Sequence, residues 1–212
     1  GTVGVGSVKY WNGKKHVHVE PVAERSQRIV SQSHKSATIE VAVEDWQVEG
    51  KMVDMDVQYT MQGGHRDMRC DVYLSEEVEG LCTGVQMIPN NGKSPRSLGG
   101  SYDTIIVVPN GTILASWGTD WPVNDSAKFA KETVGLAVFI PIENAGAPVR
   151  DKRNSLCILK QEKAQNGYST HFYLTCVGAT KEDHPVASNA TEWYAYLRKW
   201  AKKLPYSQLL KQ

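Results

Sequence analysis

The chain has 212 residues, enough for one large domain with a substantial core. Its 24 Lys and Arg residues nearly balance 23 Asp and Glu residues, so no global field favours nucleic acid or an anionic membrane. No apolar run approaches the length of a membrane-spanning helix, which is about twenty residues. We therefore expect a single domain over residues 1–212 that neither binds nucleic acid nor spans a membrane.

Strict alternation of apolar and polar side chains marks the first half of the chain. It extends over residues 37–44, 52–61 and 68–74, where for example Cys70 and Val72 flank an aspartate. Such a period of two is typical of antiparallel strands with one buried face and one face in water. Turn signals at Val48–Lys51 and Gly63-Gly64 separate these segments.

Later segments are apolar on both faces. Thr104–Val108, Ile113–Trp117 and Val134–Ile140 are predicted to be central strands that lie between two layers. Asn154–Lys160 and Tyr168–Val177 follow, which brings the expected total to at least nine strands. Residues 89–103 form a long predicted loop, a kind of segment that often carries function.

One helix is predicted near the C-terminus, over residues 189–204. It begins with a capping pattern formed by Asn189 and Glu192 and ends before Pro205. Five apolar residues form one stripe along it: Trp193, Tyr196, Leu197, Trp200 and Leu204. Many strands with one terminal helix indicate a mainly β fold, an antiparallel β-sandwich with one C-terminal helix.

The cysteines and histidines give no sign of a metal centre, and we expect neither a metal nor a cofactor. The four cysteines lack C-x-x-C spacing, and each lies in an apolar, strand-like run: Cys70, Cys82, Cys157 and Cys176. Buried free thiols are expected, with a Cys70–Cys82 disulfide as the alternative. His16 and His18 share a strand face and could chelate a metal, but solvation on an edge strand explains them better.

Tryptophans and carboxylates gather on a loop within Gly111–Pro141. Trp117, Asp120, Trp121 and Asp125 lie between two apolar runs. Indole rings stack on the apolar faces of sugar rings, and nearby acids hold hydroxyls or transfer protons. We expect Trp121 and Asp120 to face solvent in a concave carbohydrate site with Trp117 packed behind them. The alternative is two core tryptophans at the end of the sandwich.

A series of short motifs resembles one known family. In chain order they are Gly6-Ser7 with Trp11-Asn12-Gly13, Asp45–Asp54, Arg69–Ser75, Ala115–Gly118, Gly135–Pro141, His171–Tyr173, and Glu192-Trp193 with Tyr196-Leu197. Together they resemble a domain of unknown function from polysaccharide-utilisation loci of gut and marine bacteria, related to the galactose-mutarotase-like supersandwich. The resemblance implies a periplasmic or secreted protein that acts on, or binds, plant or algal glycans.

The resemblance covers the C-terminal half of such family members, and the chain begins at Gly1 without an initiator methionine. We therefore expect a longer natural protein, whose missing N-terminal portion is a partner of this domain. The chain departs from the family at Thr180, where the family carries a tryptophan. No established catalytic residue comes with the resemblance.

His171 is the best candidate for proton transfer, because mutarotase-like sandwiches use a histidine and a carboxylate on a sheet face. It alternates with Tyr173 on a strand, and Asp120 is the candidate carboxylate. An ordinary exposed histidine is the alternative. Tyr173 joins Trp117 and Trp121 as a candidate for substrate binding.

Two charged groups complete the candidates. Arg150 and Arg153 belong to a basic cluster that could hold a uronate carboxylate or a sulfate, although a solvated loop explains it equally well. Asp56, Arg69 and Asp71, with Asp54, are predicted to form a polar stripe across neighbouring strands, for which a charge ladder is the default.

The sequence therefore predicts a carbohydrate-active protein of bacterial glycan degradation. One hypothesis is an enzyme that acts on oligosaccharides by hydrolase, lyase or epimerase chemistry. The other is a non-catalytic carbohydrate-binding or accessory module that uses the same tryptophans.

Overall fold

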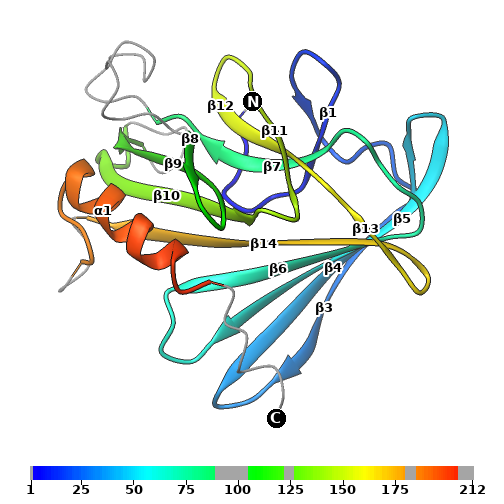
Figure 1. The fold of residues 1–212 in the computed structure, drawn as a ribbon, viewed down its shortest axis with the longest axis horizontal. Helices are drawn as coiled ribbons and strands as arrows, with labels where there is room; N and C mark the ends of the chain where they lie inside the picture. Colours follow the sequence, from blue (N-terminus) through cyan, green and yellow to red (C-terminus); the bar gives the residue numbers. More distant parts are fainter. Residues whose placement is uncertain (1, 89–104, 122–126, 180–184, 205–212) are drawn as a thin grey trace.

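The computed structural model describes residues 2–88, 105–121, 127–179 and 185–204. Two antiparallel sheets pack face to face, and one helix lies on the far side of the larger sheet (Figure 1). The predicted β-sandwich with a C-terminal helix is thus confirmed. The predicted loop at 89–103 lies outside the described residues, as do Asp125, Thr180 and Pro205.

The smaller sheet has five strands. In spatial order they are β11 (Ala145–Arg150), β12 (Asn154–Leu159), β7 (Leu81–Gln86), β1 (Lys9–Trp11) and β2 (His16–Val17).

The larger sheet has nine strands. Its spatial order is β3 (Glu24–Gln32), β4 (Ser36–Val48), β5 (Lys51–Gln62), β6 (Asp67–Leu74), β14 (Gly167–Gly178), β10 (Glu132–Pro141), β9 (Gly111–Asp120) and β8 (Ile105–Val108), and β13 (Glu162–Ala164) pairs with β14. Strand β14 therefore lies between two groups of strands that are separate in sequence.

The main core fills the space between the two sheets. The alternation predicted for β5 and β6 is confirmed, since Val57 and Cys70 point inward while Asp56 and Asp71 point away. The predicted turn at Val48–Lys51 is also present, with Glu49 and Gly50 at φ values of 51° and 73°. A left-handed backbone at Gly50 suits the tight connection between β4 and β5.

Strands β9 and β10 are central, as their apolar sequences predict. Leu114 and Val138 face the core between the sheets, whereas Ile113 and Phe139 face the helix. The same prediction is wrong for β8, which lies at the edge of the sheet with Val107 79% exposed. An apolar run of four residues does not distinguish an edge strand from a central one, because both give the same pattern.

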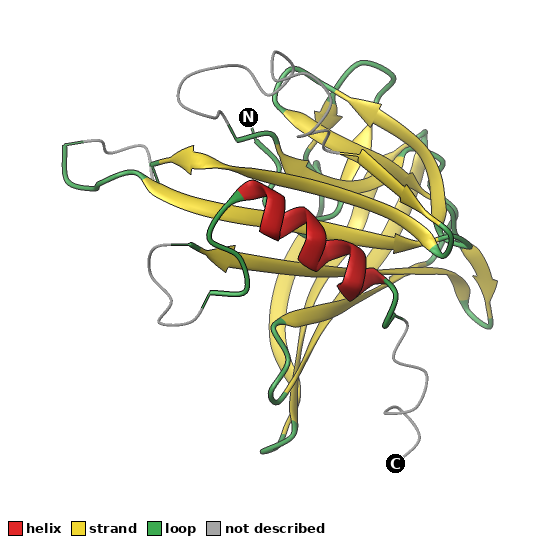
Figure 2. Ribbon diagram, turned by 60° about the vertical axis from the view of Figure 1, so that its left-hand side comes forward, coloured by secondary structure: helices red, strands yellow, loops and turns green. Residues whose placement is uncertain are grey.

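Helix α1 (Ala190–Ala201) covers the outer face of β9 and β10 (Figure 2). Its start is capped as predicted, because the side chain of Asn189 accepts a hydrogen bond of 3.0 Å from the backbone N–H of Glu192. Trp193 is fully buried against the sheet. The indole Nε1 of Trp200 donates a 2.6 Å hydrogen bond to Oδ2 of Asp67, which ties the helix to β6.

No helix among the described residues is long and apolar enough to cross a membrane.

The four cysteines are free thiols, so the alternative of a Cys70–Cys82 disulfide is wrong. Three of them are buried, and burial raises the pKa of Cys82 to about 12 and that of Cys157 to about 11. Cys176 is exposed, contrary to the expectation that every thiol would be buried. It lies near the end of β14 on the face opposite Val177.

Replacing Gly135 by alanine should destabilise the fold. A Cβ atom there would lie 2.7 Å from two ring carbons of Trp193 and 2.9 Å from Cγ1 of Val177, closer than packed atoms tolerate. We expect the free energy of unfolding to fall by about 1–3 kcal/mol, the usual cost of overpacking, in a urea titration. Gly4→Ala is the control, because its nearest neighbour would be 3.8 Å away. Equal stability of the two variants would contradict this packing.

Candidate functional site

Beyond helix α1, the outer face of the larger sheet is polar. We call this surface the open face and define it by ten side chains from β3 to β6 and β14: Arg28, Thr38, Glu40, Asp56, Gln58, Thr60, Arg69, Asp71, Tyr73 and His171. Five of them stand at one level on five neighbouring strands, in the order Arg28, Glu40, Gln58, Asp71 and His171. Side chains in register across antiparallel strands are close neighbours, so the five form one continuous row.

Hydrogen bonds order the row at its β3 end. Nε of Arg28 donates to Oε1 of Glu40 at 2.7 Å, and Nε2 of Gln58 donates to Oε2 of Glu40 at 2.8 Å. These two bonds lower the pKa of Glu40, which is buried among its partners. Burial, followed by the charge of Glu40, raises the pKa of Asp56 on the adjacent level.

The middle of the open face carries a bidentate ion pair. Nε of Arg69 lies 2.9 Å from both carboxylate oxygens of Asp71, and its Nη2 lies 2.7 Å from Oδ1. Nη1 of Arg69 also approaches the hydroxyl of Tyr173 at 3.4 Å, and the guanidinium lies 5.9 Å from that ring's centre. A planar fork of this kind fixes the position of both charged groups.

His171 is half-buried next to this pair. Burial, followed by the positive charge of Arg69, lowers its pKa, and the negative charge of Asp71 opposes the shift. The imidazole is therefore neutral at neutral pH and can accept a proton or a hydrogen bond. Its ring meets that of Tyr173 edge-on, with centroids 5.9 Å apart.

Tyr173 is placed differently from the expectation of a substrate-binding residue, because only 2% of it is exposed. It packs against Phe139 at the edge of the helix-covered region, with ring centroids 6.3 Å apart. Its place is beneath Arg69 and beside His171. The structure thus brings His171 and Tyr173 together, and the buried ring of Tyr173 contacts both His171 and Arg69 of the open face.

The tryptophan motif lies elsewhere. Trp121 is 42% exposed, and Nζ of Lys131 lies 4.2 Å from the centre of its ring. Trp117 packs against Trp193, with ring centroids 6.4 Å apart. Trp117 is level with Val177, six residues along β14 from His171, which corresponds to about 20 Å. The tryptophans therefore do not share a site with His171, because Trp117 packs against Trp193 of α1 whereas His171 lies on the open face.

Asp120 was expected on a loop after Trp117, but it lies in a strand. Strand β9 continues to Asp120, which pairs with Glu132 on β10. Its Oδ1 accepts a 2.9 Å hydrogen bond from the backbone N–H of Trp121. Because β10 supplies a full-length partner strand, pairing continues through residues that alone read as loop.

Arg150 and Arg153 lie on the smaller sheet, far from the open face in the fold. Arg150 ends β11, whereas Arg153 belongs to the turn before β12 and lines a pocket of about 450 Å³. We call this the basic pocket. Its lining comes from the hairpin of β1 and β2 and from the turn between β11 and β12: Lys14, Lys15, His16, Val17, His18, Asp151, Lys152 and Arg153.

A buried hydrogen-bond network forms one wall of the basic pocket. Nδ1 of His16 lies 2.5 Å from Oδ2 of Asp151, and Oδ1 of Asp151 accepts bonds from the backbone of Arg153 and from the amide of Asn154. Burial opposes ionisation of Asp151, but its hydrogen bonds, that from His16 first, lower its pKa to about 2. Because 135 residues separate His16 from Asp151, no local sequence signal indicates this pair.

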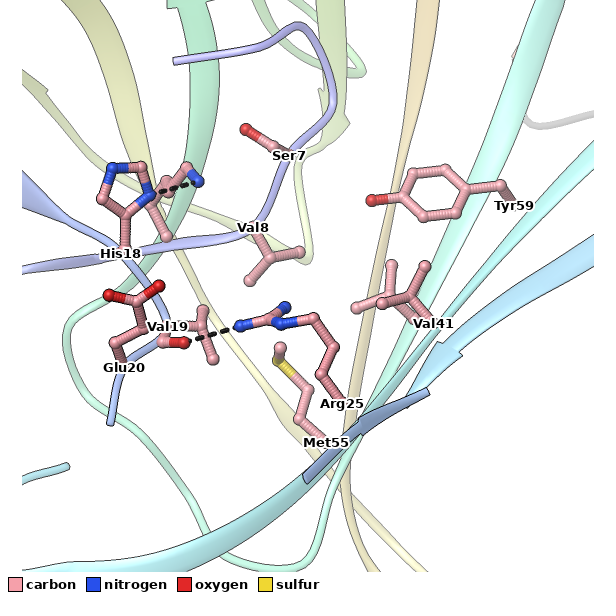
Figure 3. Close-up of a pocket in the computed structure, with 11 residues that line it drawn as sticks. Ser7, Val8, His18, Val19, Glu20, Arg25, Val41, Met55 and Tyr59 are labelled. Carbon is pink, nitrogen blue, oxygen red and sulfur yellow. Dashed lines mark hydrogen bonds between the residues drawn. The ribbon is translucent and has the colours of Figure 1, made fainter. Parts of the chain in front are cut away.

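A second, smaller pocket of about 220 Å³ opens between the sheets beside β2 and β3 (Figure 3). Lys9 contacts Nδ1 of His18 at 3.1 Å, and Arg25 donates to the carbonyl oxygen of Val19 at 2.8 Å. Burial, followed by the charge of Arg25, lowers the pKa of Lys9. His18 lines both pockets, so the two are neighbours.

Within the ranges that the structure describes, no three potential metal ligands from His, Cys, Asp and Glu gather into a group that could hold a metal ion.

The charges around His171 should move its pKa in opposite directions when they are removed. Arg69→Gln removes a nearby cation and should raise this pKa, whereas Asp71→Asn removes an anion and should lower it further. NMR titration of the imidazole C–H signals measures both changes. In the unsubstituted protein the midpoint should lie below that of a free histidine. Shifts of the same sign in both variants would contradict the geometry.

Asp151→Asn should destabilise the protein at neutral pH and leave it unaffected in strong acid. The folded-state pKa of about 2 lies below the ordinary 3.8, so the carboxylate contributes stability above pH 4 that is lost as pH falls towards 2. We expect a loss of about 2 kcal/mol at pH 7 by urea unfolding, with the difference shrinking between pH 4 and 2. Glu44→Gln, on the exposed part of β4, is the control. A difference independent of pH would refute this account.

Comparison with known proteins gives a family. The chain matches the family described as "Domain of unknown function (DUF4861)" over residues 1–207. No curated protein and no solved structure matches it. Because the match covers nearly the whole chain, the protein belongs to the DUF4861 family.

Proposed function

We propose that the protein binds carbohydrate on the open face of its larger sheet. The observation that carries the proposal is the row of five polar side chains on five adjacent strands, held in place by mutual hydrogen bonds. At a strand spacing of about 4.8 Å, such a row extends over roughly 19 Å. A flat, ordered array of donors and acceptors suits the hydroxyls of an oligosaccharide more than a compact metabolite.

Tyr73 adds a stacking surface to the open face. It is 43% exposed and stands on β6 opposite Asp56, one level from Asp71. An exposed aromatic ring beside fixed polar groups can cover the apolar face of a sugar ring, while the polar groups hold its hydroxyls. We therefore place a sugar ring over Tyr73 with its hydroxyls towards Asp71 and Asp56.

A catalytic role is the second candidate, favoured by the state of His171. A neutral imidazole can act as a base, and Arg69 beside it can stabilise a developing negative charge. Asp71 lies at the same level on the neighbouring strand, and so replaces the more distant Asp120 as the carboxylate partner. The chemistry would be that of a hydrolase, lyase or epimerase.

The wider setting is part of the same proposal. We propose that the protein serves bacterial polysaccharide utilisation on plant or algal glycans, in the periplasm or outside the cell. We also propose a relationship to galactose-mutarotase-like supersandwiches. The two-layered antiparallel fold is compatible with that relationship. Trp121 remains a candidate for a separate sugar contact, because it is exposed.

Tyr73→Ala tests the binding site. In a glycan array followed by calorimetry on the oligosaccharide that binds best, we expect binding to weaken by about 1–3 kcal/mol, the value of a large apolar side chain. Thermal stability should hardly change, because Tyr73 is exposed. His171→Ala in the same assay separates binding from catalysis: turnover should disappear if the protein is an enzyme, whereas a binding module has none to lose.

Val107→Ser is the control, since Val107 is 79% exposed on the edge strand β8, away from the open face. Trp121→Ala is assayed beside it. If Trp121→Ala weakens binding and Tyr73→Ala does not, the site lies at the tryptophans and the open face is a structural charge ladder. If no oligosaccharide binds the unsubstituted protein, the proposal is wrong.

A further inference from the structure

The basic pocket holds an excess of positive charge that the described protein does not neutralise. Its cations are Lys14, Lys15, Lys152 and Arg153, against the single carboxylate of Asp151. Among the described residues, none of these four cations makes an ion pair or a hydrogen bond through its side chain. On the open face, by contrast, both arginines pair with carboxylates, Arg28 with Glu40 and Arg69 with Asp71. The grouping therefore points to a negative partner outside the described residues.

The one carboxylate in the pocket is already occupied. Asp151 accepts hydrogen bonds from His16, from the amide of Asn154 and from two backbone N–H groups of its own turn. A carboxylate with this many donors has few acceptor sites left for hydrogen bonds from the lysines around it. Within the part of the chain that the structure describes, four cations thus line the pocket against one carboxylate.

His16 gives the pocket a polar wall with a defined orientation. A carboxylate can only accept, so Nδ1 of His16 carries the proton that it shares with Asp151. Its second ring nitrogen is Nε2, and the residue is only 8% exposed. In the part of the chain that the structure describes, Nε2 has no partner, and it is not among the fully enclosed polar atoms. It is therefore left to meet a ligand hydroxyl, which can donate to a neutral ring or accept from a protonated one.

The two segments that form the pocket are held together rigidly. His16 lies on β2 and Asp151 follows β11, and Asn154 bonds both Asp151 and the backbone N–H of Val3. Asn154 is fully buried. Positions fixed in this way lose little conformational freedom on binding, which favours a specific ligand over a loose ion atmosphere.

We infer that the basic pocket binds an anionic sugar, with the lysines and Arg153 on its sulfate ester or carboxylate and His16 on an adjacent hydroxyl. A volume of about 450 Å³ lies within the usual range for small-ligand pockets. Lysine and arginine are the usual partners of such oxyanions, and Arg153 can hold two oxygens at once. This inference rests on the proposed carbohydrate function for the identity of the ligand, but not for the presence of an anion site.

The first experiment uses inorganic sulfate, which does not depend on any glycan. Sodium sulfate is titrated into the isotope-labelled protein and followed by NMR, with sodium chloride at equal ionic strength as the reference. We expect saturable shifts of the His16 ring signals and of the amides of Lys15 and Arg153. Shifts that sulfate and chloride produce equally, or none at His16, would overturn the inference.

The second experiment compares a double variant of the pocket with a matched control. Lys15→Gln with Arg153→Gln removes two exposed lining cations, and Lys35→Gln with Lys163→Gln removes two exposed cations that do not line the pocket. We expect the pocket variant to bind acidic oligosaccharides at least about tenfold more weakly, as for the loss of charge-assisted hydrogen bonds. The control should bind them normally. Equal loss in both variants would mean that only net charge matters, and would refute a specific pocket.

Three ligands separate the possible sources of the anion. A carrageenan oligosaccharide carries sulfate esters, an oligogalacturonide carries carboxylates, and a neutral galactan oligosaccharide carries neither. The oligosaccharide whose binding weakens in the pocket variant identifies the anion that the pocket holds. The open face is tested separately: the neutral galactan oligosaccharide should bind more weakly to Tyr73→Ala but normally to the pocket variant. If sulfate binds at His16 while no glycan binds, the anion site stands and the carbohydrate function fails. If glycans bind but the pocket variant binds the acidic ones normally, the carbohydrate function stands and the anion site fails.

Discussion

The aromatic side of helix α1 is the contact on which the arrangement of the larger sheet depends. Strands β9 and β10 are apolar on both faces, so one face needs a cover besides the smaller sheet, and Trp193 and Trp200 supply it. The cover is short, because α1 has twelve residues. The bond from Trp200 to the carboxylate of Asp67 marks where it ends. Beyond that line the sheet needs polar side chains, and the open face begins there.

The two polar surfaces of the protein differ in how their charges are balanced. On the open face, Arg28 pairs with Glu40 and Arg69 with Asp71, so little net charge remains. Such a surface presents directed hydrogen bonds with weak long-range attraction. In the basic pocket the cations outnumber the carboxylate, and attraction for an anion extends to about a Debye length, roughly 8 Å at physiological salt. A neutral ligand suits the first surface and an anionic ligand the second.

The sequence predicted the class of fold, the faces of β5 and β6 and the capped helix, because each depends on patterns within a few residues. Alternation alone also predicts the polar stripe of Asp54, Asp56, Arg69 and Asp71, because it puts the residues of each strand on one face. What it did not predict needs long-range geometry. The edge position of β8 depends on strand order, and the pairing of His16 with Asp151 depends on two turns 135 residues apart. The distance between His171 and Trp117 likewise follows from the pairing of β14 with β10, two strands that are not consecutive in the chain.

The place of β14 between β6 and β10 has a consequence for how the chain is made. During synthesis, β3–β6 and β8–β10 emerge as two separate antiparallel groups, and the last strand of each has one edge without a partner. They cannot join into one sheet until β14, which ends at Gly178, has left the ribosome, and the covering helix follows later still. Unpaired edges are open to wrong partners during that interval. The nascent protein therefore depends on a late segment to close its sheet, and a ribosome that stalls before that point leaves two exposed edges in the cell.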